Sequence, residues 1–307
     1  MSLFSILLTI VGLSLFEIIS SIDNAVINAE VLSTMSEKAK RWFSTWGLFA
    51  AVFLIRGLLP WLIVFFTNPD LGILGSLTAT FSNDPRVKES IELSSPILLM
   101  GGGVFLIFLF FHWLFLEPKE FGIRGERFLY SQGVWFYAVV SVILSIIVWE
   151  SLKMNPLVAF SAIIGSTAFF IVHGFKENAK NQEESLLSNK SNFSDLSKIL
   201  YLEIIDATFS IDGVLGAFAF TLSVPLILLG NGLGAFVLRE LTLKNIDKIK
   251  KYVFLKNGAM YSILFLGLIM IMDGFGYQIP EWLSPVVTFI VIGFFFLKSK
   301  KLLKNNI

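Results

Sequence analysis

The sequence contains nine segments of about 20 mostly apolar residues, the length that a helix needs to cross the hydrocarbon core of a bilayer. They cover residues 3–32, 43–67, 93–116, 132–150, 156–173, 199–222, 225–243, 253–272 and 282–297. Apolar residues make up 55% of the 307-residue chain, more than a soluble protein of this size exposes. Backbone groups find no hydrogen-bond partners in lipid, so such segments have to be helical. The sequence therefore predicts an all-α polytopic membrane protein with about nine transmembrane helices.

Lysine and arginine are unevenly distributed over the connections between these segments. Nineteen of the 24 basic residues lie in or directly beside alternate connections, at 33–42, 117–131, 174–198, 244–252 and 298–307. The intervening connections hold only three. Connections rich in Lys and Arg stay in the cytoplasm. We therefore expect a multi-pass protein of the cell membrane with its N-terminus outside and its C-terminus in the cytoplasm.

Two of the apolar segments carry a similar acidic motif. Glu17 and Asp23 stand six residues apart in EIISSID, and Asp206 and Asp212 stand six residues apart in DATFSID. Placing a carboxylate at bilayer depth costs roughly a few kcal/mol or more. An acid within a membrane span is therefore interpreted first as part of a functional site. The four acids are therefore the first candidates for a site.

The spacing of the acids constrains the shape of the first helix. On an unbroken helix, Glu17 and Asp23 lie about 240° apart around the axis and roughly 9 Å apart along it. They would not share a face. Either the helix is interrupted near Ser20 and Ser21, whose hydroxyls can satisfy freed backbone groups, or the two acids face different neighbours.

Further oxygen-bearing side chains accompany the acids. Asn24 and Asn28 share a helical stripe with Glu17, and Glu203 adds an acid one turn before Asp206. Oxygen ligands fit Mn²⁺, Mg²⁺ or Ca²⁺, and the chain has no cysteine for a thiolate site. The candidate metal ligands are Glu17, Asp23, Asn24, Asp206 and Asp212, with Glu203 and Asn28 as additional ligands.

Arg56 and Arg239 are candidate counter-ions within the apolar segments. In the simplest alternative, the buried acids only pair with these arginines and hold helices together. Four or five acids against two arginines leave an excess of negative charge. That excess requires cations or protons, which favours an ion-binding or transport role.

The acidic motifs belong to a longer internal repeat. Gly47–Arg56 and Gly230–Arg239 share a Gly, eight residues, Arg frame, and the segments that begin at Trp135 and Trp282 align without gaps. Given the expected topology, the two acidic helices run in opposite directions, so the repeat is inverted. Inverted repeats are typical of transporters with a site at the repeat interface.

The repeat predicts an arrangement of four spans, one crossing span and four spans. We assign residues 1–150 to the first repeat, 151–198 to the crossing helix and a polar cytoplasmic linker, and 199–307 to the second repeat. The polar stretch 174–198 is expected to be flexible. Residues 101–103 and the glycines near Asn231 are expected to permit close helix packing, and Asn231 could mark an unwound stretch. His112 and His173 are interpreted as interfacial polar residues.

Together, EIISSIDNAV, its second copy SIDGVLGAF and the Gly-to-Arg frame resemble the TerC family of integral membrane proteins, within the superfamily that includes LysE-type exporters. The resemblance covers most of the chain. It implies export of divalent metal, above all manganese, and an association with tellurite resistance. By this likeness the matching residues are Glu17, Asp23, Asn24, Asp206 and Asp212. The second copy departs from the first at Gly213, which stands where the first has Asn24.

The resulting expectation is a transporter, not an enzyme, that exports a divalent cation, Mn²⁺ first and Mg²⁺ or Ca²⁺ as alternatives, in exchange for protons. Its partners are the lipid bilayer, the metal ion and protons. No nucleic acid and no permanently bound cofactor are expected, and the oligomeric state is left open. Two alternatives stand beside it: an exporter of an organic cation or amino acid, and a membrane-protein assembly factor.

Overall fold

The computed structural model describes residues 3–50, 52, 57–58, 61–62, 65–66, 69–78, 85–188 and 194–305. In these residues every regular element is a helix and there is no strand. Six helical stretches among them are long and apolar enough to cross a membrane: Leu3–Ser20, Leu93–Leu116, Gly133–Leu152, Pro156–Asn178, Val224–Thr242 and Leu255–Gly274. The chain is therefore a polytopic α-helical membrane protein, as the sequence predicts.

The longer helices overlap the expected segments, with the first segment divided in two and with α7 and α10 extended beyond theirs. They are α1 (Leu3–Ser20), α2 (Ile22–Ser33), α7 (Pro85–Leu116), α9 (Phe136–Leu152), α10 (Pro156–Ser188), α11 (Asp195–Ala217), α12 (Val224–Lys250), α13 (Leu255–Gly274) and α14 (Leu283–Asn305). The shorter ones are α3 (Glu37–Trp42), η1 (Phe43–Gly47), α4 (Leu48–Ala50), η3 (Pro69–Leu71), α6 (Gly72–Thr78), α8 (Glu126–Ser131) and η5 (Gly133–Trp135). Much of the expected second span, 43–67, lies outside the described residues, so the total of nine spans stays a prediction.

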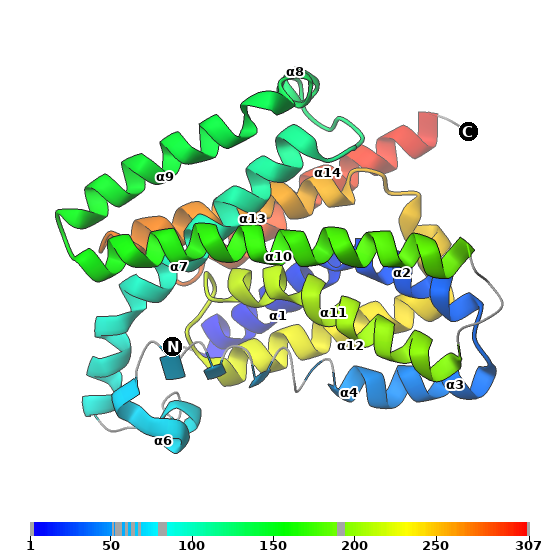
Figure 1. Ribbon diagram of the computed structural model, residues 1–307, viewed down its shortest axis with the longest axis horizontal. Helices are drawn as coiled ribbons and strands as arrows, with labels where there is room; N and C mark the ends of the chain where they lie inside the picture. The colour runs from blue at the N-terminus through cyan, green and yellow to red at the C-terminus, as the bar shows by residue number, and fades with distance from the viewer. Residues whose placement is uncertain are drawn as a thin grey trace.

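Helices α7 and α13 form the centre of the bundle. The spanning part of α7 is 78% buried and that of α13 is 67% buried, against 17% for α9. The two central helices are antiparallel: Gly274 at the end of α13 packs on Met100, whereas Tyr261 near its start contacts Trp113, with ring centroids 5.8 Å apart. Helix α10 packs against α7, and Figure 1 shows it running along nearly the whole molecule.

Glycines let α7 approach two neighbours at backbone distance. A Cβ added at Gly103 would lie 3.0 Å from the carbonyl oxygen of Gly267 in α13, and one added at Gly267 would lie 3.2 Å from that of Gly103. Elsewhere on α7, the carbonyl oxygen of Gly101 occupies the place of a Cβ on Gly165 of α10. The expected packing role of residues 101–103 is confirmed.

Helix α9 presents large apolar side chains outward. Ile146 and the indoles of Trp135 and Trp149 are all exposed. In water this surface would be costly, but in a bilayer it faces lipid, and tryptophans near both ends of a span are typical of the two interfaces. The outward side of α9 therefore fits a membrane environment.

The basic segments meet at one end of the bundle. The contacts that connect them are Ser36 Oγ to Asp195 (2.5 Å), Lys250 to Glu30 (3.3 Å), the Phe254 amide to Ser299 Oγ (3.0 Å), and Lys298 to the Gly122 carbonyl. In Figure 1 the end of α10, the start of α11 and the C-terminal end of α14 lie together on the right. Described residues in or directly beside the five basic segments thus lie near one another, and the alternation of nine spans stays a prediction.

Two expectations are wrong. The polar stretch after Gly174 is not a flexible linker along its length, because α10 continues through it to Ser188. Its Glu, Lys, Gln and Leu residues are strong helix formers. Nor is the chain unwound at Asn231, since α12 runs without a break from Val224 to Lys250. Gly230 and Gly234 on either side of Asn231 pack against α1 instead.

Candidate functional site

The first acidic helix is interrupted inside its motif. Helix α1 ends at Ser20, α2 begins at Ile22, and Ser21 between them has φ −97° and ψ 8°. The Ser21 hydroxyl donates to Glu17 Oε1 over 3.1 Å. Of the two options that the spacing leaves open, interruption near Ser20 and Ser21 therefore holds for the first helix. The corresponding helix α11 is continuous.

Glu17 lies in a niche formed by two glycines. Its side chain is fully buried. A Cβ added at Gly213 of α11 would lie 2.9 Å from Glu17 Oε2, and one added at Gly234 of α12 would lie 2.7 Å from its Cβ. Because the niche leaves no room for a larger neighbour, it fixes the Glu17 carboxylate between α11 and α12.

Asp206 of α11 contacts α2, the helix that follows α1 in the chain. The Asn24 amide donates to Asp206 Oδ1 over 2.5 Å, and both residues are buried. Among the described residues, Asn24 Oδ1 has no hydrogen-bond partner. This oxygen is therefore an acceptor beside a carboxylate, which is a suitable ligand for a hard cation.

The two contacts are reciprocal. Glu17 and Asp206 hold the same position in their motifs, and Asn24 and Gly213 both follow the second acid. Each first acid therefore meets the residue after the second acid of the opposite helix. The longer glutamate faces glycine and the shorter aspartate faces asparagine. The departure at Gly213 has a steric reason, since an asparagine there would collide with the Glu17 carboxylate.

Asp212 points away from Asp206. Its Oδ2 accepts a hydrogen bond from Lys176 of α10, in an ion pair whose side chains are only 16% and 12% exposed, respectively. Asp206 and Asp212 stand six positions apart on a continuous helix, and this turns them to different neighbours, the second option that the spacing leaves open.

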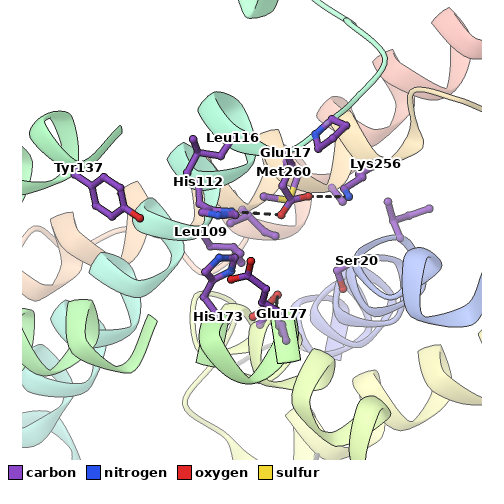
Figure 2. A pocket seen from close by; sticks show the side chains of 16 residues that line it. Ser20, Leu109, His112, Leu116, Glu117, Tyr137, His173, Glu177, Lys256 and Met260 are labelled. Atoms are coloured by element: carbon purple, nitrogen blue, oxygen red, sulfur yellow. Dashed lines mark hydrogen bonds and ion pairs between the residues drawn. The ribbon is translucent and has the colours of Figure 1, made fainter. Parts of the chain in front are cut away.

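A cavity of about 540 Å³ lies beside Asp212. Its charged and imidazole lining comes from His112, Glu117, His173, Lys176, Glu177, Asp212 and Lys256, and we call it the histidine cavity. Ser20, from the first acidic motif, also lines it (Figure 2). The cavity therefore reaches both motif-bearing helices.

The two histidines of the chain meet in this cavity. The ring centroids of His112 and His173 are 3.9 Å apart, and His112 Nδ1 lies 3.5 Å from Glu117 Oε1. Glu117 also pairs with Lys256 at 2.9 Å. Figure 2 shows these groups converging from α7, α10 and α13. The interpretation of the histidines as interfacial residues misses their pairing. The sequence did contain one sign of this pairing, because both histidines stand at the ends of their expected spans on the same side of the membrane.

Glu203 and Arg239 flank Gly47. The Glu203 carboxylate occupies the place of a Cβ on Gly47, and Arg239 Nη1 lies 3.3 Å from that place. Arg239 Nη1 also donates to the Phe43 carbonyl over 2.7 Å, with the guanidinium 4.1 Å from the ring centroid. Arg239 therefore lies near the additional acid of the second motif. Arg56, the other expected counter-ion, lies outside the described residues.

The remaining expected ligands are Asn28 and Asp23. Asn28 is buried, and among the described residues its Oδ1 has no hydrogen-bond partner. Asp23 belongs to α2, but its side chain lies outside what the structure describes. Within the described part no three His, Asp or Glu side chains are grouped to hold a metal ion. The structure thus brings Asn24 to Asp206, places Glu17 against Gly213 and Gly234, and pairs Asp212 with Lys176.

The fold and the buried acids define a polytopic α-helical membrane protein with ionisable groups at its helix contacts. The chain belongs to a family described as a protein of unknown function, DUF475, whose family model matches residues 22–306. Neither a curated protein nor a solved structure matches the chain. The likeness to the TerC family therefore stays an expectation from the motifs.

Proposed function

We propose that this protein is a transporter that exports a divalent metal cation, Mn²⁺ in the first place, in exchange for protons at the acids of α1, α2 and α11. The observation that carries the proposal is the reciprocal contact in which Glu17 faces Gly213 and Asp206 faces Asn24. In this contact each first acid faces the residue after the second acid of the opposite motif, so the two half-sites share one geometry, as two halves of a single site would.

The crossing of α7 and α13 supports an inverted repeat. Gly103 and Gly267 contact each other's carbonyl oxygens, as equivalent positions on a pseudo-two-fold axis would. The separation between equivalent positions falls along the chain, from 189 residues at Glu17 to 147 at Trp135. Gly103 and Gly267, 164 residues apart, fit this series. The contact between α7 and α13 thus supports pairing the third expected span with the eighth, two segments for which the sequence offers no matching motif.

A third reciprocal contact supports the same symmetry. Ser14 Oγ donates to the Gly230 carbonyl over 2.9 Å. The equivalent positions in the opposite halves are Glu203 and Gly47, which are also in contact. An acid thus replaces a hydroxyl in one of two similar places, which makes the second half-site richer in negative charge.

Charge then favours exchange with protons. Moving a divalent cation outward against an inside-negative membrane potential costs about 4.6 kcal/mol per 100 mV, before any concentration gradient. Carboxylates in a poorly solvated site bind either a cation or a proton, because an isolated charge there is costly. Competition of metal and protons for the same oxygens would couple the two movements.

The basic end of the bundle supports one orientation in the membrane. We assign it to the cytoplasm by the positive-inside rule, which places the N-terminus outside. The histidine cavity lies at this end, because Glu117 and Lys256 border the basic segments. A cation would then reach Asp212 from the cytoplasm through this cavity, in the cell membrane.

The test measures total cell manganese under manganese load, in cells expressing the wild type, Asp206→Asn, Asp212→Asn or Glu150→Gln. Glu150 is an exposed acid of α9 that pairs with Lys153, so its variant controls for loss of a carboxylate elsewhere. We expect manganese to fall with the wild type and Glu150→Gln but not with the two aspartate variants. Equal manganese in all four strains at matched expression would reject the proposal.

The histidine cavity favours one second candidate, an exporter of a small amino acid or organic cation. Its lining carries ammonium groups and carboxylates, and its volume of about 540 Å³ admits an organic solute. In proteoliposomes, counterflow of a labelled amino acid without manganese movement would favour this candidate over metal export.

A further inference from the structure

Lys176 is the charged partner of Asp212, yet it comes from outside both repeats. It belongs to α10, the crossing helix, and approaches the second acidic motif from the side. The pair is largely buried, with side-chain exposures of 12% for Lys176 and 16% for Asp212. In a membrane protein a buried carboxylate needs such a partner.

The pair lies at the wall of the histidine cavity. Both Lys176 and Asp212 line it, and so does Glu177, the next residue of α10. Asp212 Oδ1 is buried and, among the described residues, has no hydrogen-bond partner. The Lys176 ammonium group thus binds Asp212 Oδ2, while Asp212 Oδ1 can accept a second ligand.

An ammonium group at a carboxylate occupies the place that a transported cation would take. Lysine is a point charge on a flexible four-carbon stem, so it can leave without moving α10. Glu177, beside it on α10 and at the same cavity, offers an alternative partner. A divalent cation gains more from the carboxylate than a single ammonium does, because its charge is double.

We propose that Lys176 is a tethered cation that occupies Asp212 while the site is empty, and that an incoming divalent cation displaces it. This inference rests on the proposed function. Displacement keeps Asp212 neutralised before and after binding, so no bare carboxylate is formed. It also lowers the apparent affinity, because the cation binds only the fraction of molecules whose Lys176 has left.

The first experiment measures binding of MnCl₂ to the purified full-length protein by calorimetry, for the wild type, Lys176→Gln, Lys176→Arg and Lys153→Gln. Lys153 is an exposed lysine that caps the C-terminal end of α9 and also pairs with an acid. If Lys176 occupies the site nine-tenths of the time, Lys176→Gln should bind Mn²⁺ about tenfold more tightly. Lys176→Arg and Lys153→Gln should stay near the wild type. An affinity of Lys176→Gln equal to the wild type would overturn the inference.

The second experiment needs no variant at Lys176. A small amine-acylating reagent is applied to the wild type with and without MnCl₂, and modification of Lys176 is followed by peptide mass spectrometry. Displacement predicts a several-fold faster reaction with Mn²⁺, whereas a fixed ion pair predicts no change. If Lys176→Gln alone does not fold, Lys176→Gln with Asp212→Asn removes both charges, and the acylation result still decides.

The two proposals fail in different ways. Mn²⁺ binding by the wild type that is no tighter in Lys176→Gln, with unchanged acylation, rejects the tethered cation and leaves metal transport standing. Absence of Mn²⁺ binding in both proteins rejects both proposals. Binding by Lys176→Gln but not by the wild type supports the tethered cation strongly, because the competitor has then hidden the site.

Discussion

The Asn24 amide donates to Asp206 Oδ1 over 2.5 Å, although 182 residues separate them in sequence. Under the symmetry of the two motifs, this contact corresponds to that of Glu17 with Gly213. The neutral asparagine gives Asp206 a hydrogen-bond donor without adding a charge. The Asn24 amide therefore holds the Asp206 carboxylate in place without bringing a basic group into the contact.

Asn24→Asp should replace this hydrogen bond by a close pair of carboxylates. Two like charges at that distance cannot both persist, so the pair must take up a proton or a cation. We expect a lower melting temperature at neutral pH, recovered in part by MnCl₂ or by acid. Thermal unfolding in detergent measures both effects. Asn155→Asp is the matched control, because exposed Asn155 caps α10 through an oxygen that aspartate retains. An unchanged melting temperature would contradict the close contact.

Gly213→Ala should disturb the Glu17 niche while leaving the fold intact. The added methyl group would lie 2.9 Å from Glu17 Oε2, the far end of a side chain that can shift. We expect reduced manganese export with a melting temperature close to the wild type. Gly293→Ala in α14, where nothing lies within 4 Å of the added carbon, is the control and should export normally. Normal export by Gly213→Ala would show that the position of Glu17 is not critical.

Gly165→Ala should be the most destabilising of the glycine substitutions. Its methyl group would overlap the Gly101 carbonyl, a backbone atom that cannot rotate away, so α7 and α10 would have to separate. Overpacking of this kind costs about 1–3 kcal/mol. Gly174→Ala, on the same helix with open space around it, should be neutral or slightly stabilising. Thermal unfolding of the two proteins compares them directly, and equal melting temperatures would refute this packing.

Lys119 should react as an unusually acidic lysine. Burial lowers its pKa from 10.5 to about 8, against the opposing effect of the Glu126 and Glu117 carboxylates. Its ammonium group donates to the Trp113 and Leu114 carbonyls over 2.5 and 2.6 Å at the end of α7. At pH 8 we therefore expect faster acylation of Lys119 than of an exposed lysine such as Lys153, measured by mass spectrometry. Equal rates would contradict the pKa.

The same pKa gives a direction to the pH dependence of stability. Because the folded-state pKa lies below the unfolded value, the unfolded chain binds more protons between pH 8 and pH 10.5. The contribution of Lys119 to stability should therefore rise with pH across this window and be least favourable below it. Lys119→Gln should flatten that part of the profile in thermal unfolding. A slope unchanged by the substitution would assign it to other groups.

Local patterns predicted much of this molecule. The apolar segments predicted the helices, and the basic residues predicted which connections lie near one end of the bundle. The glycines of residues 101–103 predicted close helix packing. The interruption near Ser21 was one of two options that the acid spacing allowed. All of these depend on neighbours in sequence or on the solvent, which a pattern records directly.

The site was harder to predict, because it depends on how helices rotate against one another. Nothing in the sequence brings His112 to His173 or Lys176 to Asp212, since each pair joins helices whose relative rotation is set by packing. The helical continuation of α10 to Ser188 was missed for another reason: a polar stretch rich in helix formers resembles a linker in composition. The division into 1–150, 151–198 and 199–307 stays a prediction.

The backbone contacts of α7 limit how this protein can change shape. At Gly101–Gly165 and at Gly103–Gly267 the helix backbones are in direct contact, and ring contacts such as Phe105–Phe169 and Phe110–Tyr261 interlock the same helices beside these points. Helices α7, α10 and α13 should then move as one rigid body. Any switch between inward- and outward-facing forms would slide this body past α1, α11 and α12. Lys176 and Asp212 stand on opposite sides of that boundary, so their ion pair would have to break before the rigid body could move.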